Sequence, residues 1–454
     1  MIHIILVLTG YLNIILAAAY TLTCFQLFRE LPPKRSKKLF RRQERLLLYF
    51  HFFCNLDLVL EQKDIRLIYF YGAQLLFLLL VFIFYRRIYP HTSRLLTNNM
   101  MFFMVVGLVM QTRLSYEAYA LKQFITVAVC FSAAMLLPFL MKRIHLWQRL
   151  TWFYGITGFL LLSTVMVMGV NLNGASNWIR IAGVSIQPSE FAKILFVLFV
   201  GCRLAQSLEL KDLMVTTVLA AAYVLVLVWE KDLGGALIFF IVYIVMLYVA
   251  TGRLTLFISG VLAGSGAAVV AYQLFDHVQT RVNAWRDPWA LIDGGGYQIC
   301  QSLFALGTGS WFGIGLGQGA PDSVPIVYSD FIFSALAEEF GTIFVLCLIL
   351  VFVSCFIVFL DASMRSRNSM YKLIALGFGV CFIFQVFLNI GGAVKFIPLT
   401  GVTLPLISYG RSSVASVLLI FGITQGLVML GRSDEETEHE ENERATNKKN
   451  RIYG

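Results

Sequence analysis

The feature that most constrains this chain is a series of long apolar runs, each of roughly 17–25 residues. A helix of that length crosses the hydrocarbon core of a bilayer, whereas the strands of a membrane β-barrel are short and alternate between apolar and polar residues. The composition agrees, because 58% of the 454 residues are hydrophobic and only 14% are charged. The sequence therefore predicts an all-α, multi-spanning membrane protein.

The apolar runs divide into a core and an N-terminal extension. We expect a ten-helix core within residues 99–432, with spans at 99–115, 119–141, 150–171, 188–207, 213–229, 234–251, 254–275, 331–360, 373–392 and 402–431. Ahead of it, residues 1–98 are expected to form a membrane extension of about three further helices, at 2–27, 46–62 and 66–86. The polar, charge-rich residues 433–454 predict a disordered tail.

Basic residues predict the orientation. The formal net charge is +10, and Lys and Arg concentrate in segment 29–45 and in the linkers 141–149, 250–253 and 361–372. If every predicted span crosses the membrane, all four segments lie on one side together with the tail, and the positive-inside rule makes that side the cytoplasm. Membrane topology therefore accounts for the basic excess, and we expect no nucleic-acid partner.

Two loops on the opposite side are informative. Residues 171–187 read NLNGASNWIRIAGVSIQ, and the longer loop, at about 276–329, is rich in glycine and aromatic residues. A loop of that length without strong secondary structure is usually either functional or disordered. Its aromatic content argues against disorder, so we expect it to fold over a site.

Charged residues stand at the start of two predicted spans. Glu190 and Lys193 lie three residues apart on one helix face, and charges inside a membrane usually mark a functional cavity. The alternative is a structural ion pair that pins two helices together. Asp232, in the stretch WEKDLGGAL (229–237), is either a site residue or an interfacial helix N-cap.

The stretch SDFIFSALAEEFG (329–341) places three carboxylates in one apolar helix. Asp330 lies at its mouth, directly after the long loop, where it is either a functional carboxylate or a helix cap. Glu338 is about 12 Å deeper and about 80° around the helix from Asp330, so both can face one interior groove. Glu339 points elsewhere, and we assign it no role beyond helix packing.

The last predicted span begins with interrupted helix. Pro398, Pro405 and Gly410 break the regular pattern, and irregular backbone at membrane depth is tolerated where it lines a cavity. Lys395 precedes this segment, and Ser408 lies within it. The polar groups together predict an outward-facing pocket with one carboxylate, several cations and a deeper polar groove. Such a pocket suits an anionic amphiphile, a lipid with a phosphate head.

The same stretches resemble the SEDS family of cell-wall proteins, of the RodA, FtsW and SpoVE type. Between about residues 99 and 432 the matching motifs occur in family order: NGASNWIRIAGVSIQPSEFAK (173–193), KDLGGAL (231–237), GGGYQICQSLFALGTGSWFGIGLG (294–317), SDFIFSALAEEFG (329–341) and LTGVTLPLISYG (399–410). An ordered set is far more specific than any one motif. The chain departs from the family at Ile326, where a glutamate is usual, at Asn177, where arginine is frequent, and at Arg411, where glycine is typical.

The resemblance implies a peptidoglycan glycosyltransferase that polymerises lipid II at the outer face of the cytoplasmic membrane, in elongation, division or sporulation. It implies that Asp330 is catalytic and that Trp178, Glu190 and Lys193 are functionally important. The usual partner in the family is a class B penicillin-binding protein, a transpeptidase. The candidate substrate-binding residues are Trp178, Arg180, Glu190, Lys193, Asp232, Glu338, Lys395 and Ser408.

A lone carboxylate fits the implied chemistry. A polyprenyl pyrophosphate is a good leaving group, so a general acid is less necessary than in glycosidases. Asp330 can then act as the general base that deprotonates the attacking 4-hydroxyl, and inversion at the anomeric carbon gives a β-1,4 linkage. Arg180, Lys193 and Lys395 are candidates for stabilising the developing pyrophosphate charge.

Two other functions stay open, a lipid II flippase or transporter and a non-catalytic scaffold for a transpeptidase. A transporter would depend on the Glu190–Lys193 pair more than on Asp330. No metal-ligand cluster is evident, because the eight cysteines form no CxxC pair and the six histidines show no paired spacing. The only cofactor left open is a divalent cation that bridges Asp330 and a pyrophosphate.

Overall fold

The computed structural model describes the backbone of residues 2–143, 147–172, 175–181 and 183–453. Its helices are α1 (Ile2–Gln26), α2 (Pro33–Gln62), α3 (Arg66–Ile88), α4 (Arg94–Leu114), α5 (Leu121–Ala134), α6 (Leu137–Arg143), α7 (Thr151–Met168), α8 (Pro188–Gln206), α9 (Leu210–Trp229), α10 (Leu233–Thr251), α11 (Leu254–Leu274), α12 (Asp276–Arg286), α13 (Tyr297–Gly309), α14 (Ile332–Arg365), α15 (Ser369–Ala393) and α16 (Arg411–Tyr453). A π-helical turn, η1 (Tyr116–Ala120), precedes α5, and two 3₁₀ turns are η2 (Trp147–Leu150) and η3 (Pro321–Ser323).

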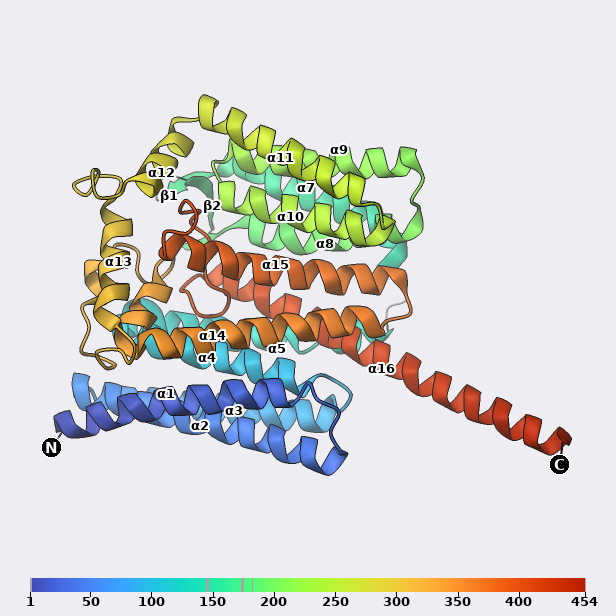
Figure 1. Ribbon diagram of the computed structural model, residues 1–454, viewed down its shortest axis with the longest axis horizontal. Helices are drawn as coiled ribbons and strands as arrows, with labels where there is room; N and C mark the ends of the chain where they lie inside the picture. Colours follow the sequence, from blue (N-terminus) through green and yellow to red (C-terminus); the bar gives the residue numbers. More distant parts are fainter. Residues whose placement is uncertain (1, 144–146, 173–174, 182, 454) are drawn as a thin grey trace.

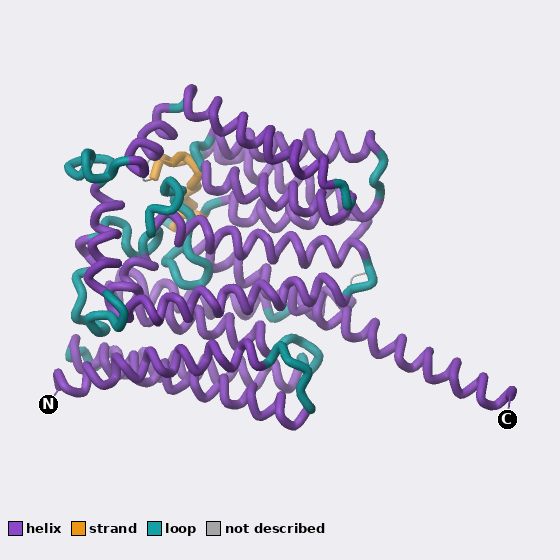
Figure 2. Tube along the Cα trace, in the orientation of Figure 1, coloured by secondary structure: helices purple, strands orange, loops and turns teal. Residues whose placement is uncertain are grey.

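The long helices lie lengthwise in one bundle whose two ends differ (Figure 1). At one end, named the loop end, an antiparallel sheet in the order β1-β2-β3 lies near α12 and the long loop (Figure 2). Its strands are β1 (Val170–Leu172), β2 (Ala175–Ile181) and β3 (Val184–Ile186). The other end, named the tail end, carries short linkers between helices and the C-terminal part of α16 (Figure 1).

Length and composition make this an integral membrane protein. Among the described residues, 11 helices are long and apolar enough to cross a membrane. Helices α2 and α8 lie lengthwise in the same bundle but are more highly charged, and α8 carries Glu190, Lys193 and Arg203 within its 19 residues. The prediction of an all-α, multi-spanning membrane protein is confirmed.

Helix α4 is the most enclosed of these helices. The whole of its apolar window is buried, because α2 covers one side and α14 another. Aromatic side chains fill these interfaces: Phe102 lies 5.6 Å from Phe50 of α2 between ring centroids, and Phe103 stacks on Phe352 of α14 at 4.1 Å. Phe102 also stacks on Tyr20 of α1 at 4.4 Å. The core of the bundle therefore continues without a break into the N-terminal helices.

Buried polar side chains join the N-terminal helices to the rest of the bundle. The Asn99 side chain of α4 accepts a hydrogen bond from the Tyr20 hydroxyl (3.1 Å) and donates one to Ser354 of α14 (2.8 Å). Within the N-terminal helices, the Thr9 hydroxyl donates to Asp57 at 2.6 Å. These partners matter because an unsatisfied polar group in an apolar interior costs several kcal/mol, on the order of 2–7.

The predicted spans all coincide with helices, but several boundaries differ. The last helix begins at Arg411 and not at 402, because residues 402–410 form irregular backbone at the loop end. The predicted span 119–141 is divided between α5 and α6. Helix α14 is interrupted at Gly341, which has a φ of 84°. Its backbone lies so close to Gly313 that a Cβ atom at position 341 would collide with it.

The predicted domain limits stay predictions. The limit at 98/99 falls inside α4, which begins at Arg94. Helix α16 extends to Tyr453, but the side chains of residues 433–454, the predicted disordered tail, lie outside the described part of the structure.

Candidate active site

Asp330 lies at the loop end, two residues before α14 begins. Its carboxylate is half-buried, and Oδ1 accepts a hydrogen bond from the Ser329 hydroxyl at 2.8 Å. The N-cap position of α14 is Phe331, and no side chain caps the helix, so the capping alternative for Asp330 finds no support. Burial raises the pKa of the Asp330 carboxyl above its ordinary value, against the lowering effects of Ser329 and of the Arg281 charge.

Two polar side chains hold the backbone around Asp330. Asn389 of α15 donates from Nδ2 to the carbonyl oxygens of Asp330 (3.0 Å) and Val402 (2.7 Å). Ser408 donates to the Ser329 carbonyl at 2.6 Å and accepts from the Leu404 amide at 2.8 Å. Ser408 therefore fixes the residue before Asp330, and its hydroxyl is already engaged within the protein.

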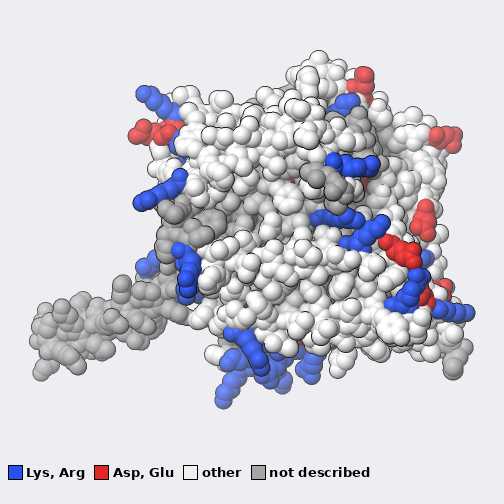
Figure 3. Space-filling view, turned by 180° about the vertical axis from the view of Figure 1, so that it is seen from behind, with Lys and Arg blue, Asp and Glu red and all other residues white. Residues whose placement is uncertain are grey.

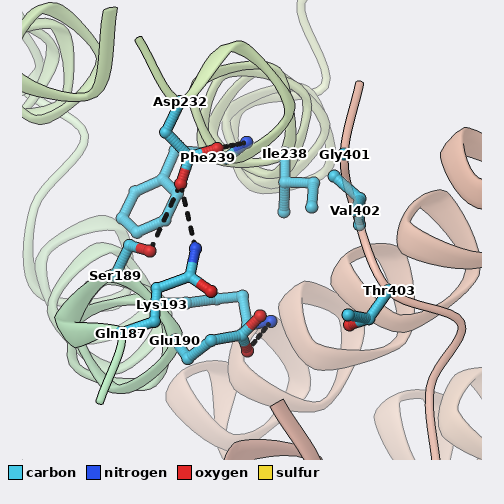
Figure 4. A pocket seen from close by; sticks show the side chains of 11 residues that line it. Gln187, Ser189, Glu190, Lys193, Asp232, Ile238, Phe239, Gly401, Val402 and Thr403 are labelled. Atoms are coloured by element: carbon cyan, nitrogen blue, oxygen red, sulfur yellow. Dashed lines mark hydrogen bonds and ion pairs between the residues drawn. The ribbon is translucent and has the colours of Figure 1, made fainter. Parts of the chain in front are cut away.

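Segment 400–403 lies beside the carboxylate. Gly401 has a φ of 73°, and a Cβ atom at this position would stand 3.7 Å from Asp330 Oδ2. Gly401, Val402 and Thr403 also line a cavity between α8 and α10 (Figure 4). Gly401 therefore lies beside both the Asp330 carboxylate and the cavity, although Asp330 is not among the residues that line the cavity.

Asp232 borders the cavity and serves two purposes at once. Its Oδ1 accepts from the Gly235 amide at 2.8 Å, so it is the N-cap of α10, as one alternative predicts. Its Oδ2 accepts from Asn177 (3.0 Å), Gln187 (3.2 Å) and Ser189 (3.4 Å), side chains of β2, the β3–α8 turn and α8. Asp232 therefore ties the small sheet to the helices that line the cavity.

Glu190 and Lys193 form the predicted ion pair, with Oε2 and Nζ 2.8 Å apart. Lys193 also donates to Gln385 Oε1 of α15 at 3.0 Å, and Ser416 of α16 donates to Glu190 Oε2 at 2.6 Å. The pair thus joins three helices, as the structural alternative expects, while both side chains also line the cavity (Figure 4). Counted out to its open mouth, the cavity holds about 400 Å³ of empty space.

Arg281 of α12 is a site residue that the sequence interpretation missed. Its Nη1 donates to the carbonyl oxygen of Thr400 at 3.3 Å, and its charge acts on both Asp232 and Asp330. Burial lowers the pKa of the Arg281 guanidinium, and the two carboxylates oppose that shift. No sequence signal placed it here, because the long loop was expected to lack regular structure and α12 could not be positioned.

Glu338 and Glu339 face the long loop. Glu338 Oε1 accepts from the Ala320 amide at 3.2 Å, so the structure places this carboxylate beneath residues 319–320 and not among the residues that line the cavity. Glu339 pairs with Arg113 Nε of α4 at 2.9 Å, and Arg113 Nη2 reaches the carbonyls of Gly317 (3.3 Å) and Gly319 (3.0 Å). Glu339, expected only to pack, anchors the turn of the loop.

The remaining predicted residues lie around the rim of the loop end. Trp178 is half-buried in β2 opposite Val170, and Arg180 in the same strand is exposed. Lys395 is half-buried just after α15, and its carbonyl accepts from Trp285 Nε1 at 3.2 Å. None of the three lines the cavity. Among the described residues, no three His, Cys, Asp or Glu side chains gather as metal ligands.

The comparisons with known proteins agree on one family. The family model FTSW_RODA_SPOVE, described as "Cell cycle protein", matches residues 86–430. The chain belongs to this family. The peptidoglycan glycosyltransferase RodA of Mycobacterium tuberculosis is 35% identical over 366 residues, which cover 74% of this chain and 78% of that relative. The probable peptidoglycan glycosyltransferase FtsW of Aliivibrio salmonicida is 34% identical over 322 residues, covering 67% and 77%.

Solved structures of this RodA/FtsW type share the fold. A chain from a peptidoglycan synthase complex that coordinates polymerization and crosslinking matches with a TM-score of 0.63, 24% identity, and coverage of 75% of this chain and 98% of that chain. RodA, the rod shape-determining protein of Thermus thermophilus, matches with a TM-score of 0.57, 24% identity, and coverage of 75% and 97%. The family match spans α4 to α16, whereas α1, α2 and nearly all of α3 lie outside it.

Proposed function

We propose that this chain is a peptidoglycan glycosyltransferase that polymerises lipid II into β-1,4 glycan strands, with Asp330 as general base. The observation that carries the proposal is the half-buried Asp330 carboxylate at the loop end, with the Arg281 charge acting on it and Gly401 beside it, a residue that also lines a polar cavity. The relatives are named as peptidoglycan glycosyltransferases, which supports the same reaction class.

In this mechanism Asp330 accepts the proton of the 4-hydroxyl as that oxygen attacks the anomeric carbon of the second sugar. A new carbon–oxygen bond forms, the bond to the pyrophosphate oxygen breaks, and the configuration inverts. A base acts best when its pKa approaches the working pH, and burial moves Asp330 in that direction. Arg281 joins Lys193, Arg180 and Lys395 as cations that can stabilise the departing pyrophosphate.

The orientation belongs to the proposal as well. The basic segments 29–45, 250–253 and 361–372, and the described residues of 141–149, lie at the tail end (Figure 1). We assign this end to the cytoplasm together with residues 433–454. Asp330 and the cavity mouth then face outward from the cytoplasmic membrane. There a class B penicillin-binding protein would crosslink the strands, and the relative from a synthase complex supports a partner of that kind.

The test is polymerisation of lipid II by the purified chain together with the transpeptidase that co-purifies with it. We expect Asp330→Asn to abolish glycan chains on a gel, because an amide cannot accept the proton. Asp322→Asn is the matched control, an exposed carboxylate of the same loop, and should leave polymerisation intact. Undiminished synthesis by Asp330→Asn would sink the assignment, and full rescue of wall synthesis in cells by that variant would favour a scaffold.

A flippase is the second candidate, and the buried Glu190–Lys193 pair is the observation that favours it. It predicts transport of lipid II across vesicles that survives Asp330→Asn and fails in Lys193→Gln. The polymerase assay distinguishes the two functions, because a flippase makes no glycan.

A further inference from the structure

The N-terminal helices carry a dense group of exposed cations at the tail end. The exposed basic residues of this group are Arg29, Lys34, Arg35, Lys37, Lys38, Arg41, Arg42, Arg45, Arg86 and Arg87. Eight of them fall within segment 29–45, whereas each of the linkers 141–149, 250–253 and 361–372 holds three or fewer Lys and Arg. The positive-inside rule alone does not require eight Lys and Arg residues in a single linker, so segment 29–45 is a candidate for a further role.

Helical geometry gathers seven of these cations on one face of α2. At about 100° per residue, the basic positions from Lys34 to Arg45 fall within an arc of about 160°. Their stretch covers about 17 Å of helix axis. The other side of the helix carries Phe40, which packs against Arg94, and Gln43, which is fully buried. The seven cations, together with Arg86 and Arg87 at the end of α3, are named the α2 basic face.

The two acids of segment 29–45 do not neutralise the seven α2 cations of this face. Segment 29–45 contains two acids, and Glu30 precedes the helix. Glu44 is buried and pairs with Arg86 of α3, outside the basic arc. Arg41 and Arg94 lie close enough to Arg86 for their positive charges to act on it. The cations therefore repel one another across two helices, and an anionic ligand would relieve that repulsion.

The position of the basic face selects the ligand. Helices α1, α2 and α3 form the lower edge of the bundle in Figure 1, and the view from behind in Figure 3 shows Lys and Arg gathered at that edge with no Asp or Glu among them. The apolar part of α2 begins directly after Arg45, and the helix lies lengthwise in the bundle (Figure 1). The basic face thus stands where the headgroups of neighbouring lipids lie, in a layer about 5–7 Å thick outside the hydrocarbon core.

We propose that the α2 basic face binds the headgroups of anionic phospholipids in the adjacent leaflet. Clusters of four to eight Lys or Arg next to a membrane span attract such lipids, because each cation near a negative surface contributes to the attraction. The seven cations of α2 lie outside the part of the chain that matches the family model, which begins at residue 86. The α2 basic face adds a lipid-binding surface to the protein independently of the reaction at Asp330.

The experiment measures lipid selectivity of the full chain in phosphatidylcholine vesicles that contain spin-labelled lipid. We expect labelled phosphatidylglycerol to associate with the protein several-fold more than labelled phosphatidylcholine. Lys34→Gln, Lys38→Gln, Arg41→Gln and Arg45→Gln together should lower that preference several-fold, so that the two labelled lipids associate about equally. Raising the ionic strength should weaken it in the unchanged protein, because salt screens exposed charges.

The control removes four exposed cations from other tail-end elements, with Lys142→Gln, Arg149→Gln, Lys211→Gln and Arg253→Gln combined. This control should keep most of the preference for phosphatidylglycerol. An equal loss of that preference in the control and in the fourfold α2 variant would overturn the proposal, because net charge and not this surface would then be responsible. A charge-preserving variant, with Arg41→Lys, Arg42→Lys and Arg45→Lys combined, shows that the helix tolerates substitution and should bind as the unchanged protein does.

A competition experiment distinguishes binding of lipid headgroups from binding of free phosphate. Inorganic phosphate, added at an ionic strength matched with sodium chloride, should displace no more labelled lipid than the chloride does. Specific displacement by phosphate would reassign the surface to a soluble anion and overturn the lipid assignment. Unchanged phosphatidylglycerol preference in the fourfold α2 variant would overturn it outright.

Discussion

At the scale of single residues, the site depends on one arginine whose positive charge acts on two carboxylates. Arg281 acts on Asp330, the proposed base, and on Asp232, the cap of α10. It lowers the pKa of Asp330, whereas burial raises it. The arginine therefore sets how much of the Asp330 carboxyl is ionised, and ready to accept a proton, at a given pH.

This balance predicts a shift in the pH dependence of polymerisation. A general base loses activity as the pH falls through its pKa, so the acid limb of kcat/KM should lie above the ordinary range for aspartate. Arg281→Gln removes a charge that lowers the Asp330 pKa, and the acid limb should move to higher pH. A pH–rate profile checks this.

Arg286→Gln, an exposed arginine of the same helix, is the control and should leave the acid limb in place. An unmoved limb in Arg281→Gln, with activity retained, would show that Arg281 does not govern the base.

Gly401 gives a second residue-scale prediction. Its φ of 73° is strained for any residue with a Cβ atom, and that atom would contact the Asp330 carboxylate. We expect Gly401→Ala to lower polymerisation by about tenfold or more while the protein still folds, as judged by gel filtration. Gly72→Ala, at a lipid-exposed position with open space around it, should be silent. Equal activity of the two variants would contradict this role for Gly401.

At the scale of elements, the turn 315–320 of the long loop is held from two sides. From the core, Arg113 binds Glu339 and two carbonyls of the turn. From the N-terminal helices, Glu61 of α2 accepts from Gln318 Nε2 at 3.1 Å, and Tyr11 of α1 contacts Phe312 with ring centroids 5.8 Å apart. Because the same loop leads on to Asp330, both anchors bear on the site.

The two anchors differ in strength, which gives an element-scale prediction. Glu339 is fully buried, so Glu339→Gln leaves Arg113 without its charged partner and should destabilise the protein by about 1–3 kcal/mol. Gln318→Ala breaks an exposed contact and should cost well under 1 kcal/mol while making the loop easier to cleave with a protease. Thermal unfolding and limited proteolysis measure both, with Glu209→Gln as an exposed control. Equal thermal stability of the two variants would refute the ranking.

At this scale the sequence predicts the features that depend on local residue patterns, and it does not predict those that depend on contacts between distant segments. The apolar runs place every long helix, and polar residues at span ends find Asp232, Glu190 and Lys193. Glu338 was expected to share a groove with Asp330, but its carboxylate bonds to a loop whose path no local pattern encodes. Likewise the break at Gly341 depends on close approach to Gly313, a residue of a distant segment.

At the scale of the whole molecule, the N-terminal helices and the family core share one interior through α4. Asn99 connects the two parts, because its side chain forms hydrogen bonds with Tyr20 of α1 and with Ser354 of α14. The domain limit at 98/99 remains a prediction, but the packing of buried side chains crosses it.

We expect Asn99→Ala to lower stability by about 1–3 kcal/mol, since it leaves the Tyr20 hydroxyl and Ser354 without this partner. The lowered stability should appear as a reduced midpoint in thermal gel filtration. Ser132→Ala, which removes an exposed hydroxyl bonded only within α5, is the control. A midpoint equal to that of the control would mean that Asn99 is not what couples the two parts.

The enclosure of α4 has a consequence for how the protein is made. Its mean hydropathy over the best window, 1.4, is lower than that of any other candidate span, and a helix that never meets lipid has no need to dissolve in it. Such a helix partitions weakly into the bilayer on its own during synthesis. We therefore expect α4 to remain beside the insertion machinery until α1 to α3 receive it. Site-specific crosslinking of stalled nascent chains should find longer residence there for α4 than for α3. Helices α1 to α3 would then provide the surface on which α4 packs as it enters the membrane, so that these four helices assemble in the order in which they are synthesised.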